Sequence, residues 1–382
     1  MGYLRSMDGE RFEWNCHEAV TQADALITPR YIENSEGVVL VKVGDLAQAR
    51  DTDESMYRTE DGCNWTPPDG LTGQQIEAMA FDPNDETVAL AVTANEEGAN
   101  RVFRSDDAGL TWSPTDLVIE DRMFRSIRFA RGSANAVWAS AVRYESEEAW
   151  IYHSTDGGNS WSEHPVDVVS AGGLDVYVDV LVADATDPNT AWVVMGPYVD
   201  DRLLETTDGG ASFTEVYALN GDIIDGAQDA AGDLWLVTTG NYVVHRPVGG
   251  DFTRVEHAPL SIGVETDSTR LLVATRVPGE GTAMAVSSDG STFDPVYVFG
   301  ATTGPPVCLP ESDAALICSS RWAALSDIIS GDGETDTAVV EDTAAPSPPK
   351  ATTGCCSGDA SHSSAGLVFL TLLGVGRRRT ST

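Results

Sequence analysis

The chain has 382 residues, of which 42% are hydrophobic, so it has enough apolar material to bury a sizeable core. Its formal net charge is −37, and its only two lysines are Lys42 and Lys350. This balance excludes a nucleic-acid-binding protein, because no basic surface is available to neutralise phosphates. An acidic surface also favours a soluble monomer, which is the oligomeric state that we expect.

A short turn-forming sequence recurs along the chain. Three copies are eight residues long, three are seven, and 246–252 is a degenerate copy that keeps the glycines and the aromatic ring. Successive copies start between 40 and 53 residues apart. We call these copies the repeated turns. Their key positions are Ser6, Asp8, Gly9, Phe12; Thr59, Asp61, Gly62, Trp65; Ser105, Asp107, Gly109, Trp112; Ser154, Asp156, Gly158, Trp161; Thr206, Asp208, Gly210, Phe213; and Ser287, Asp289, Gly290, Phe293.

Each residue type in a repeated turn has a local physical role. Asp and Ser side chains accept hydrogen bonds from backbone N–H groups a few residues later, which closes a turn without a partner strand. Glycine adopts the positive φ that such a turn needs, and the final aromatic ring buries a large apolar area. The turns therefore predict structural hairpins. Calcium binding is the alternative, but one carboxylate per turn falls short of the several oxygen ligands that Ca²⁺ takes, so we expect no metal and no cofactor.

The repeated turn resembles the Asp-box of bacterial neuraminidase repeats, Ser-x-Asp-x-Gly-x-Thr-Trp, which occurs in sialidase-like and sortilin-like β-propellers. A period of about 40–50 residues is also typical of propellers. Between the turns, short apolar runs alternate with Gly, Pro, Asn and Asp, which indicates four short strands per unit. We therefore expect an all-β fold, a single β-propeller of about seven four-stranded blades that spans residues 1–330.

The first blade is expected to be incomplete. Only residues 2–5 precede the first repeated turn, whereas every other unit places two strands before the strand that enters its turn. Either the segment 305–318, which has the pattern of a small hairpin, patches this blade, or an upstream segment with a signal peptide and two strands completes it. We favour the upstream segment.

The C-terminal part contains a predicted helix and a predicted linker. Cys318, Trp322, Leu325 and Ile329 fall at helical spacing, so we expect one short amphipathic helix docked on the propeller. Residues 331–354 are rich in Asp, Glu, Thr, Ala and Pro, a composition that predicts an acidic, disordered linker.

The tail 355–382 has the order of an anchoring signal. Cys355 and Cys356 precede a short apolar run and three arginines, an order that resembles the C-terminal sorting tag of myxobacterial surface proteins. The resemblance implies that the tag is cleaved and that the cysteine region is kept for anchoring at the outer membrane or cell surface. A simple tail anchor is the alternative, although the apolar run is shorter than the roughly 20 residues of a spanning helix.

The four other cysteines are candidates for disulfides. The chain has no Cys-x-x-Cys pair, so a structural zinc site is not expected. If the protein is exported, we expect a Cys308–Cys318 disulfide, with Cys16–Cys63 as a second candidate.

Three classes of function remain open. We favour a non-catalytic cell-surface protein that binds a protein, peptide or glycan, because propellers present loops around a central channel. A glycoside hydrolase is the alternative, but the Arg-Ile-Pro signature of sialidases is absent and the nearest string, 28–32, does not match it. The third class is an envelope assembly factor, because some Asp-box propellers resemble photosystem assembly factors. No metalloprotease, α/β-hydrolase or P-loop motif occurs, so we assign no catalytic residue.

Overall fold

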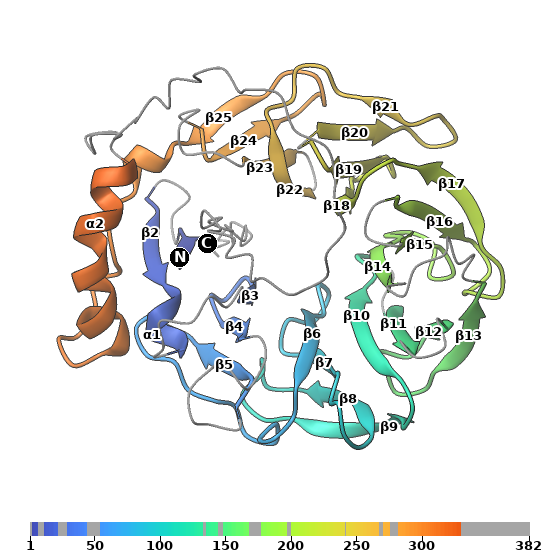
Figure 1. Cartoon of the computed structure of the whole chain (residues 1–382), viewed down its shortest axis with the longest axis horizontal. Helices are drawn as coiled ribbons and strands as arrows, with labels where there is room; N and C mark the ends of the chain where they lie inside the picture. The colour runs from blue at the N-terminus through green and yellow to red at the C-terminus, as the bar shows by residue number, and fades with distance from the viewer. Residues whose placement is uncertain are drawn as a thin grey trace, which may run out of the picture.

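The computed structural model describes residues 2–6, 11–21, 29–43, 54–132, 135–143, 148–167, 177–196, 200–240, 242–266, 270–275 and 282–329. In these residues, 25 strands form separate antiparallel sheets around one axis (Figure 1). Five sheets have four strands and one has three; these are six blades of a β-propeller, and a further sheet has two strands. The all-β propeller is therefore confirmed, whereas the count of seven four-stranded blades is not.

Within each blade the chain runs from the centre of the ring to its rim (Figure 1). The three-stranded blade comprises β3 (Arg30–Glu33), β4 (Val39–Lys42) and β5 (Met56–Thr59). The four-stranded blades are β6 (Ile76–Phe81), β7 (Ala89–Thr93), β8 (Asn100–Ser105), β9 (Ser113–Ile119); β10 (Met123–Phe129), β11 (Val137–Arg143), β12 (Glu148–Ser154), β13 (Ser162–Val166); β14 (Tyr177–Ala183), β15 (Ala191–Gly196), β16 (Arg202–Thr206), β17 (Thr214–Ala218); β18 (Ile223–Gln228), β19 (Leu234–Thr238), β20 (Tyr242–Arg246), β21 (Thr253–Arg254); and β22 (Ser261–Thr266), β23 (Leu271–Thr275), β24 (Met284–Ser287), β25 (Asp294–Tyr297).

Burial follows the place of a strand within its blade. The second strands β7, β15 and β19 are apolar runs that are buried at every residue. They lack polar alternation because a neighbouring blade covers each face of the sheet, as in sheets that are buried on both sides. The outermost strands, such as β9, carry exposed polar residues. The core therefore lies between the blades rather than in one central cluster.

The two-stranded sheet, β1 (Gly2–Arg5) and β2 (Glu13–Cys16), lies between the last blade and the three-stranded blade (Figure 1). Phe12 stacks on Tyr297 of β25 with ring centroids 4.0 Å apart, and Tyr3 lies 4.4 Å from Tyr31 of β3. In the described residues no ladder of strand hydrogen bonds joins this sheet to either neighbour. Contacts between side chains and a few loop hydrogen bonds close the ring instead.

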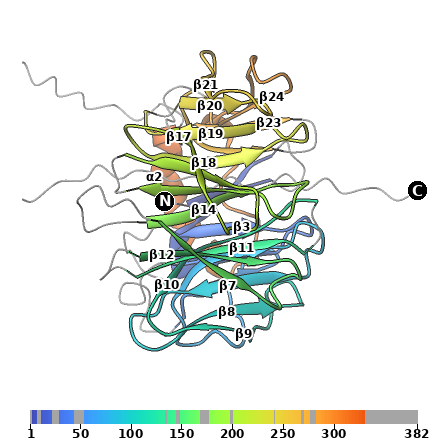
Figure 2. The ribbon, with the colours of Figure 1, turned by 90° about the vertical axis from the view of Figure 1, so that its right-hand side faces the viewer.

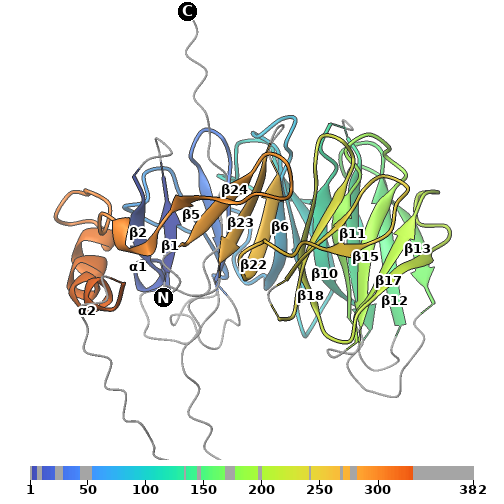
Figure 3. The same ribbon diagram turned by 90° about the horizontal axis from the view of Figure 1, so that it is seen from above.

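The segment that follows β25 is the second partner of the two-stranded sheet. The Trp14 N–H donates to the Gly304 carbonyl at 2.7 Å, and the Thr303 N–H donates to the Phe12 carbonyl at 3.0 Å. The C-terminal part of the chain therefore runs along one edge of β2. Figure 3 shows α2 (Ser319–Ile329) beside β2, and Figure 2 shows the ring of blades from the side.

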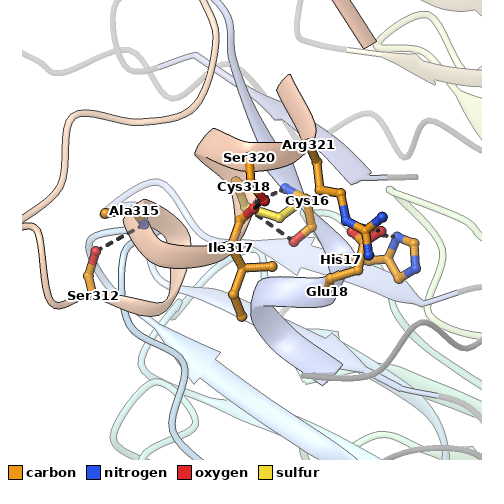
Figure 4. Close-up of a disulfide and its surroundings, with 9 residues drawn as sticks. All are labelled: Cys16, His17, Glu18, Ser312, Ala315, Ile317, Cys318, Ser320 and Arg321. Carbon is orange, nitrogen blue, oxygen red and sulfur yellow. Dashed lines mark hydrogen bonds and ion pairs between the residues drawn. A yellow bond between two sulfur atoms is a disulfide. The ribbon is translucent and has the colours of Figure 1, made fainter. Parts of the chain in front are cut away.

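Two disulfides fasten the beginning of the chain to its C-terminal extension. Cys16 is bonded to Cys318 and Cys63 to Cys308, and Figure 4 shows the first bridge where β2 meets α2. The expected Cys308–Cys318 and Cys16–Cys63 pairs are therefore wrong. The cause is ring closure, which brings cysteines 302 and 245 residues apart in sequence within bonding distance.

The segment 305–318 forms no hairpin, so that expectation is also wrong. Pro305, Pro306 and Pro310 cannot donate to a strand ladder, and Ala314–Cys318 is a π-helical turn that runs into α2. The expected short C-terminal helix is confirmed, and Trp322 packs against Trp14 with ring centroids 5.9 Å apart. A five-residue helix, α1 (His17–Thr21), was not expected. Within the described residues, no helix has the length and apolar character needed to cross a membrane.

Several predicted features lie outside the described residues. They are Asp8 and Gly9 of the first repeated turn, the linker 331–354, and the tail with Cys355 and Cys356.

The repeated turns join the third and fourth strands at the rim. Asp107 Oδ1 accepts hydrogen bonds from the N–H groups of Leu110 (3.1 Å) and Thr111 (2.8 Å), while Ser105 Oγ accepts from the Gly109 N–H (2.8 Å). The Trp112 indole N–H donates to the Gly109 carbonyl at 3.0 Å. Equivalent Asp and Ser or Thr bonds close the turns that start at Thr59, Ser154, Thr206 and Ser287.

The residue just before a repeated turn ties its blade to the next one. Arg58 Nε donates to the Ala108 carbonyl at 3.0 Å, and Arg104 Nη1 donates to the Gly157 carbonyl at 2.8 Å. Each arginine therefore reaches into the turn of the following blade and fixes the rim spacing between blades.

The first prediction concerns ring closure. Replacing Cys16 and Cys318 together by Ser should lower the free energy of unfolding by about 2–5 kcal/mol, because the bridge restricts a very long loop in the unfolded chain. Urea unfolding of the oxidised wild type and of the variant measures this difference. An unchanged unfolding midpoint would show that the bridge does not hold the ring closed.

The second prediction concerns acid. Hydrogen bonds from the Ser160 side chain and N–H lower the pKa of Asp156 to about 2, and the Thr292 and Ser291 N–H groups lower the pKa of Asp289. A carboxylate with a lowered folded pKa stabilises the protein above its unfolded pKa, and this stabilisation disappears as the pH falls through the folded pKa. We expect Asp156→Ala to cost roughly 1 kcal/mol at pH 7 and less at pH 2, where the pH equals the folded pKa and about half of the carboxyl groups are protonated. Urea titrations at both pH values check this; an equal cost at both would contradict it.

Candidate functional site

Six inner strands, β3, β6, β10, β14, β18 and β22, surround the centre of the ring (Figure 1). Charged side chains gather there on four consecutive blades. We call this set the central charged cluster; its members are Arg30, Lys42, Glu77, Arg125, Arg128 and Asp179. Four of the six are basic, which sets the cluster apart in a chain whose net charge is −37.

Lys42 and Glu77 form a close pair between the first two blades. Lys42 Nζ lies 2.6 Å from Glu77 Oε2 and also donates to the Glu77 carbonyl at 2.8 Å. Both side chains are largely buried, with exposed fractions of 14% and 17%. Burial lowers the pKa of Lys42, and the nearby Glu77 carboxylate opposes part of this shift.

Arg125 lies between two carboxylates from different blades. Its Nη1 is 3.7 Å from Glu77 Oε1 on β6, and its Nη2 is 3.5 Å from Asp179 Oδ2 on β14. These distances exceed those of direct charged hydrogen bonds, which are about 2.7–2.9 Å. The guanidinium therefore interacts with both carboxylates through charge, without binding either one tightly.

Two further arginines act on the same carboxylate. Burial raises the pKa of Asp179, and the charges of Arg125, Arg30 and Arg128 oppose this shift. Arg30 and Arg128 are both exposed. Arg125, on β10, is the one of these three arginines that forms an ion pair with Asp179; Arg30 on β3 and Arg128 on β10 act on it by charge from farther away.

Beta-bulges place two members of the cluster. The β6–β7 register skips Glu77, between Ile76 and Ala78, and the β10–β11 register skips Arg125, between Phe124 and Ser126. A bulge leaves one residue unpaired and redirects its side chain. The same skip recurs in the first two strands of the other four-stranded blades, at Leu181, Ile224 and Ile262, so it belongs to the architecture of the blade. These two side chains therefore leave the regular alternation of their strands.

Other buried carboxylates near the centre have structural partners. Asp225 accepts hydrogen bonds from the N–H groups of Gly226 and Val264, both at 2.9 Å, and so joins β18 to β22. Burial raises its pKa to about 6. Asp201 accepts from the Tyr177 hydroxyl at 2.5 Å and from the Ile223 N–H at 2.6 Å. Both carboxylates hold neighbouring elements together.

A strap crosses the ring near the inner turns. Arg131, in the turn after β10, lies 2.9 Å (Nη2) from Glu265 Oε1 and donates to the Thr266 carbonyl, both on β22. Two blades separate β10 from β22 along the chain. The strap therefore links opposite parts of the ring directly and narrows this end of the centre.

A polar cavity of about 490 Å³ lies at the rim, away from the cluster. Its lining includes Arg104, Asp107 and Thr111 of one repeated turn and Asn159 of the next. The Asp107 oxygens already accept hydrogen bonds from Leu110 and Thr111, so this cavity is a by-product of the packing between turns.

The predicted site residues and the central charged cluster occupy different places. The described residues of the repeated turns lie at the rim, where they close hairpins. Among the described residues, no group of three His, Cys, Asp or Glu side chains could hold a metal ion. The central charged cluster was not predicted from the sequence. The one signal that could have indicated it is Lys42, the one lysine before position 350.

The third prediction tests the buried pair. Glu77→Ala should lower the free energy of unfolding by about 3 kcal/mol, because it leaves Lys42 buried without its partner. As a control, Glu215→Ala breaks the exposed pair with Arg202 and should change it by less than about 1 kcal/mol. Urea unfolding measures both. Equal losses of unfolding free energy in the two variants would show that Glu77 does not compensate a buried charge on Lys42.

No protein-family model and no curated protein matches the chain. Solved structures do resemble its fold. The xyloglucanase of glycoside hydrolase family 74 from Xanthomonas campestris shares 16% identity with a TM-score of 0.50, over 70% of this chain and 46% of the enzyme. A structure of YCF48 bound to D1 peptide shares 19% identity with a TM-score of 0.40, over 58% of this chain and 68% of that one. A sialidase from a Hadza microbial source shares 14% identity with a TM-score of 0.40, over 69% and 64%.

These similarities concern architecture. The chain matches less than half the length of the xyloglucanase, and all three identities lie below 25%. Proteins that share a propeller can have unrelated activities, so function has to be argued from the site. The chain is a β-propeller whose structural neighbours include glycosidases and a peptide-bound protein.

Proposed function

We propose that the protein is an exported, non-catalytic binding propeller that holds an acidic group of a protein, peptide or glycan at the central charged cluster. The observation that carries the proposal is the position of Arg125 at the centre of the ring, 3.7 Å from Glu77 and 3.5 Å from Asp179, with Arg30 and Arg128 near enough to act on Asp179 by charge, in a chain whose net charge is −37. Guanidinium groups present several donors in a planar fork that matches the geometry of a carboxylate. An acidic ligand group is therefore the best complement to this site.

A binding role fits the carboxylates better than hydrolysis does. A glycoside hydrolase needs two carboxyl groups across the scissile bond, one to donate a proton and one to act as base or nucleophile. Glu77 lies between Lys42 and Arg125 and forms an ion pair with each of them. Asp201 and Asp225 accept hydrogen bonds from the backbone of neighbouring elements. Glu77, Asp201 and Asp225 are thus engaged in holding the fold.

The disulfides support export. Stable disulfides form in oxidising compartments, and this chain has two in its described residues. We place the protein at the cell surface or outer membrane, with the tail 355–382 as anchor through Cys355 and Cys356. It acts there as a monomer and has no nucleic-acid partner. Its ligand is a surface or extracellular molecule.

Two finer structural assignments belong to the same proposal. The repeated turns are Asp-boxes, which their shared hydrogen bonds support. The sheet of β1 and β2 is the outer half of a seventh blade, because β1 leads into the first repeated turn as the third strand of other blades does.

The fourth prediction tests the binding role. A panel of oligosaccharides and short peptides, each with a free acid and with the acid amidated or esterified, should show binding of free acids only. Arg125→Gln should weaken that binding by about tenfold to a hundredfold, because it removes a charged interaction. Fluorescence polarisation measures the dissociation constants.

Arg202→Gln is the matched control, since Arg202 pairs with Glu215 at the surface on β16 and the charge change is the same. It should leave binding unchanged. Equal binding of free and blocked ligands would overturn the proposed function. Turnover of a glycan in the panel would show that the protein is a glycosidase.

A further inference from the structure

The central charged cluster already contains a carboxylate in the position that a ligand would need. Glu77 belongs to the Lys42 pair, with Lys42 Nζ at 2.6 Å. Asp179 has no such partner of its own, yet the charges of Arg125, Arg30 and Arg128 all act on it. It is therefore the group among the three arginines that most resembles an acidic ligand.

Asp179 is held loosely. Its Oδ2 lies 3.5 Å from Arg125 Nη2, beyond the length of a direct charged hydrogen bond. Its Oδ1 is shielded from solvent and has no hydrogen-bond partner. By contrast, Asp201 and Asp225 each accept two hydrogen bonds at 2.5–2.9 Å.

A buried oxygen without a hydrogen bond lowers the stability of the fold, and a buried charged oxygen lowers it further. Burial raises the pKa of Asp179, and the three arginines oppose this shift. Oδ1 is the buried oxygen; the side chain as a whole is 33% exposed, so an anion from solvent can reach it. The groups that act on it come from several elements: Arg30 from β3, Glu77 from β6, and Arg125 and Arg128 from β10. An incoming anion that makes direct hydrogen bonds to these arginines can therefore displace it.

We propose that Asp179 is a built-in competitor for the ligand: in the free protein its carboxylate occupies the place beside Arg125, within reach of the charges of Arg30 and Arg128, that the acidic group of the ligand takes. This inference rests on the proposed function. It adds that Asp179 sets a threshold: only an acid with better hydrogen-bond geometry than Asp179, or with a higher charge, displaces it.

The test uses sulfate, a dianion at pH 7.5, as a probe of the arginine cluster. In isothermal titration at low ionic strength, Asp179→Asn should bind sulfate about tenfold to a hundredfold more tightly than the wild type, because one repelling charge is removed. Asp179→Ala should show the same gain, and it keeps the test valid if one variant folds poorly. Adding Arg125→Gln to Asp179→Asn should abolish the gain.

Asp116→Asn is the control for net charge, since it removes one exposed carboxylate from the rim. It should bind sulfate as the wild type does. If Asp179→Asn and Asp179→Ala bind sulfate no more tightly than Asp116→Asn, Asp179 is not a competitor, and the inference is wrong. This result would leave the proposed function standing as long as free-acid ligands bind the wild type, so the two failures can be told apart.

Discussion

Covalent closure of the ring is the constraint on which the rest of this structure depends. Each four-stranded blade is built from one continuous stretch of chain, and among the described strands no sheet combines strands from both ends of the sequence. The join between the last blade and the three-stranded blade rests on a two-stranded sheet, on stacked rings such as Phe12 and Tyr297, and on two disulfides. Closed propellers remove their sheet edges by completing the ring. In this chain the two disulfides join the first and last parts of the ring, where other propellers use strand pairing.

The rim and the centre of the ring are held by different interactions. At the rim, short local hydrogen bonds close the repeated turns, and Arg58 and Arg104 tie each turn to its neighbour. These bonds are formed within a few residues of one another or between adjacent blades, so they fix the spacing of the blades. At the centre, side chains from several blades meet, and the charges there are only partly matched. A hydrogen-bonded rim thus holds an incompletely satisfied centre in place, which is the arrangement that the proposed binding site requires.

The sequence predicts the parts of the fold that depend on neighbouring residues. The repeated turns close through bonds between residues two to four apart, as Asp107 and Thr111 show, so their spacing was enough to predict an all-β propeller. The disulfide pairs were predicted wrongly because they depend on which chain ends meet in space. The cluster was missed for a similar reason. Arg122, Arg125, Arg128 and Arg131 recur at every third residue, a spacing that would place neighbours on opposite faces of a regular strand. The bulge at Arg125 breaks that rule, and it depends on pairing with β11.

The bridge between Cys16 and Cys318 has a consequence for how the protein responds to proteolysis. It makes the chain between these two residues a covalent circle, 302 positions around. A protease that cuts once in any loop of that circle opens it without releasing a fragment, because both new pieces remain joined through sulfur. Exposed loop tips are the usual places of such cuts. Damage of this kind would therefore stay hidden on a non-reducing gel, and the nicked propeller would keep all its blades together.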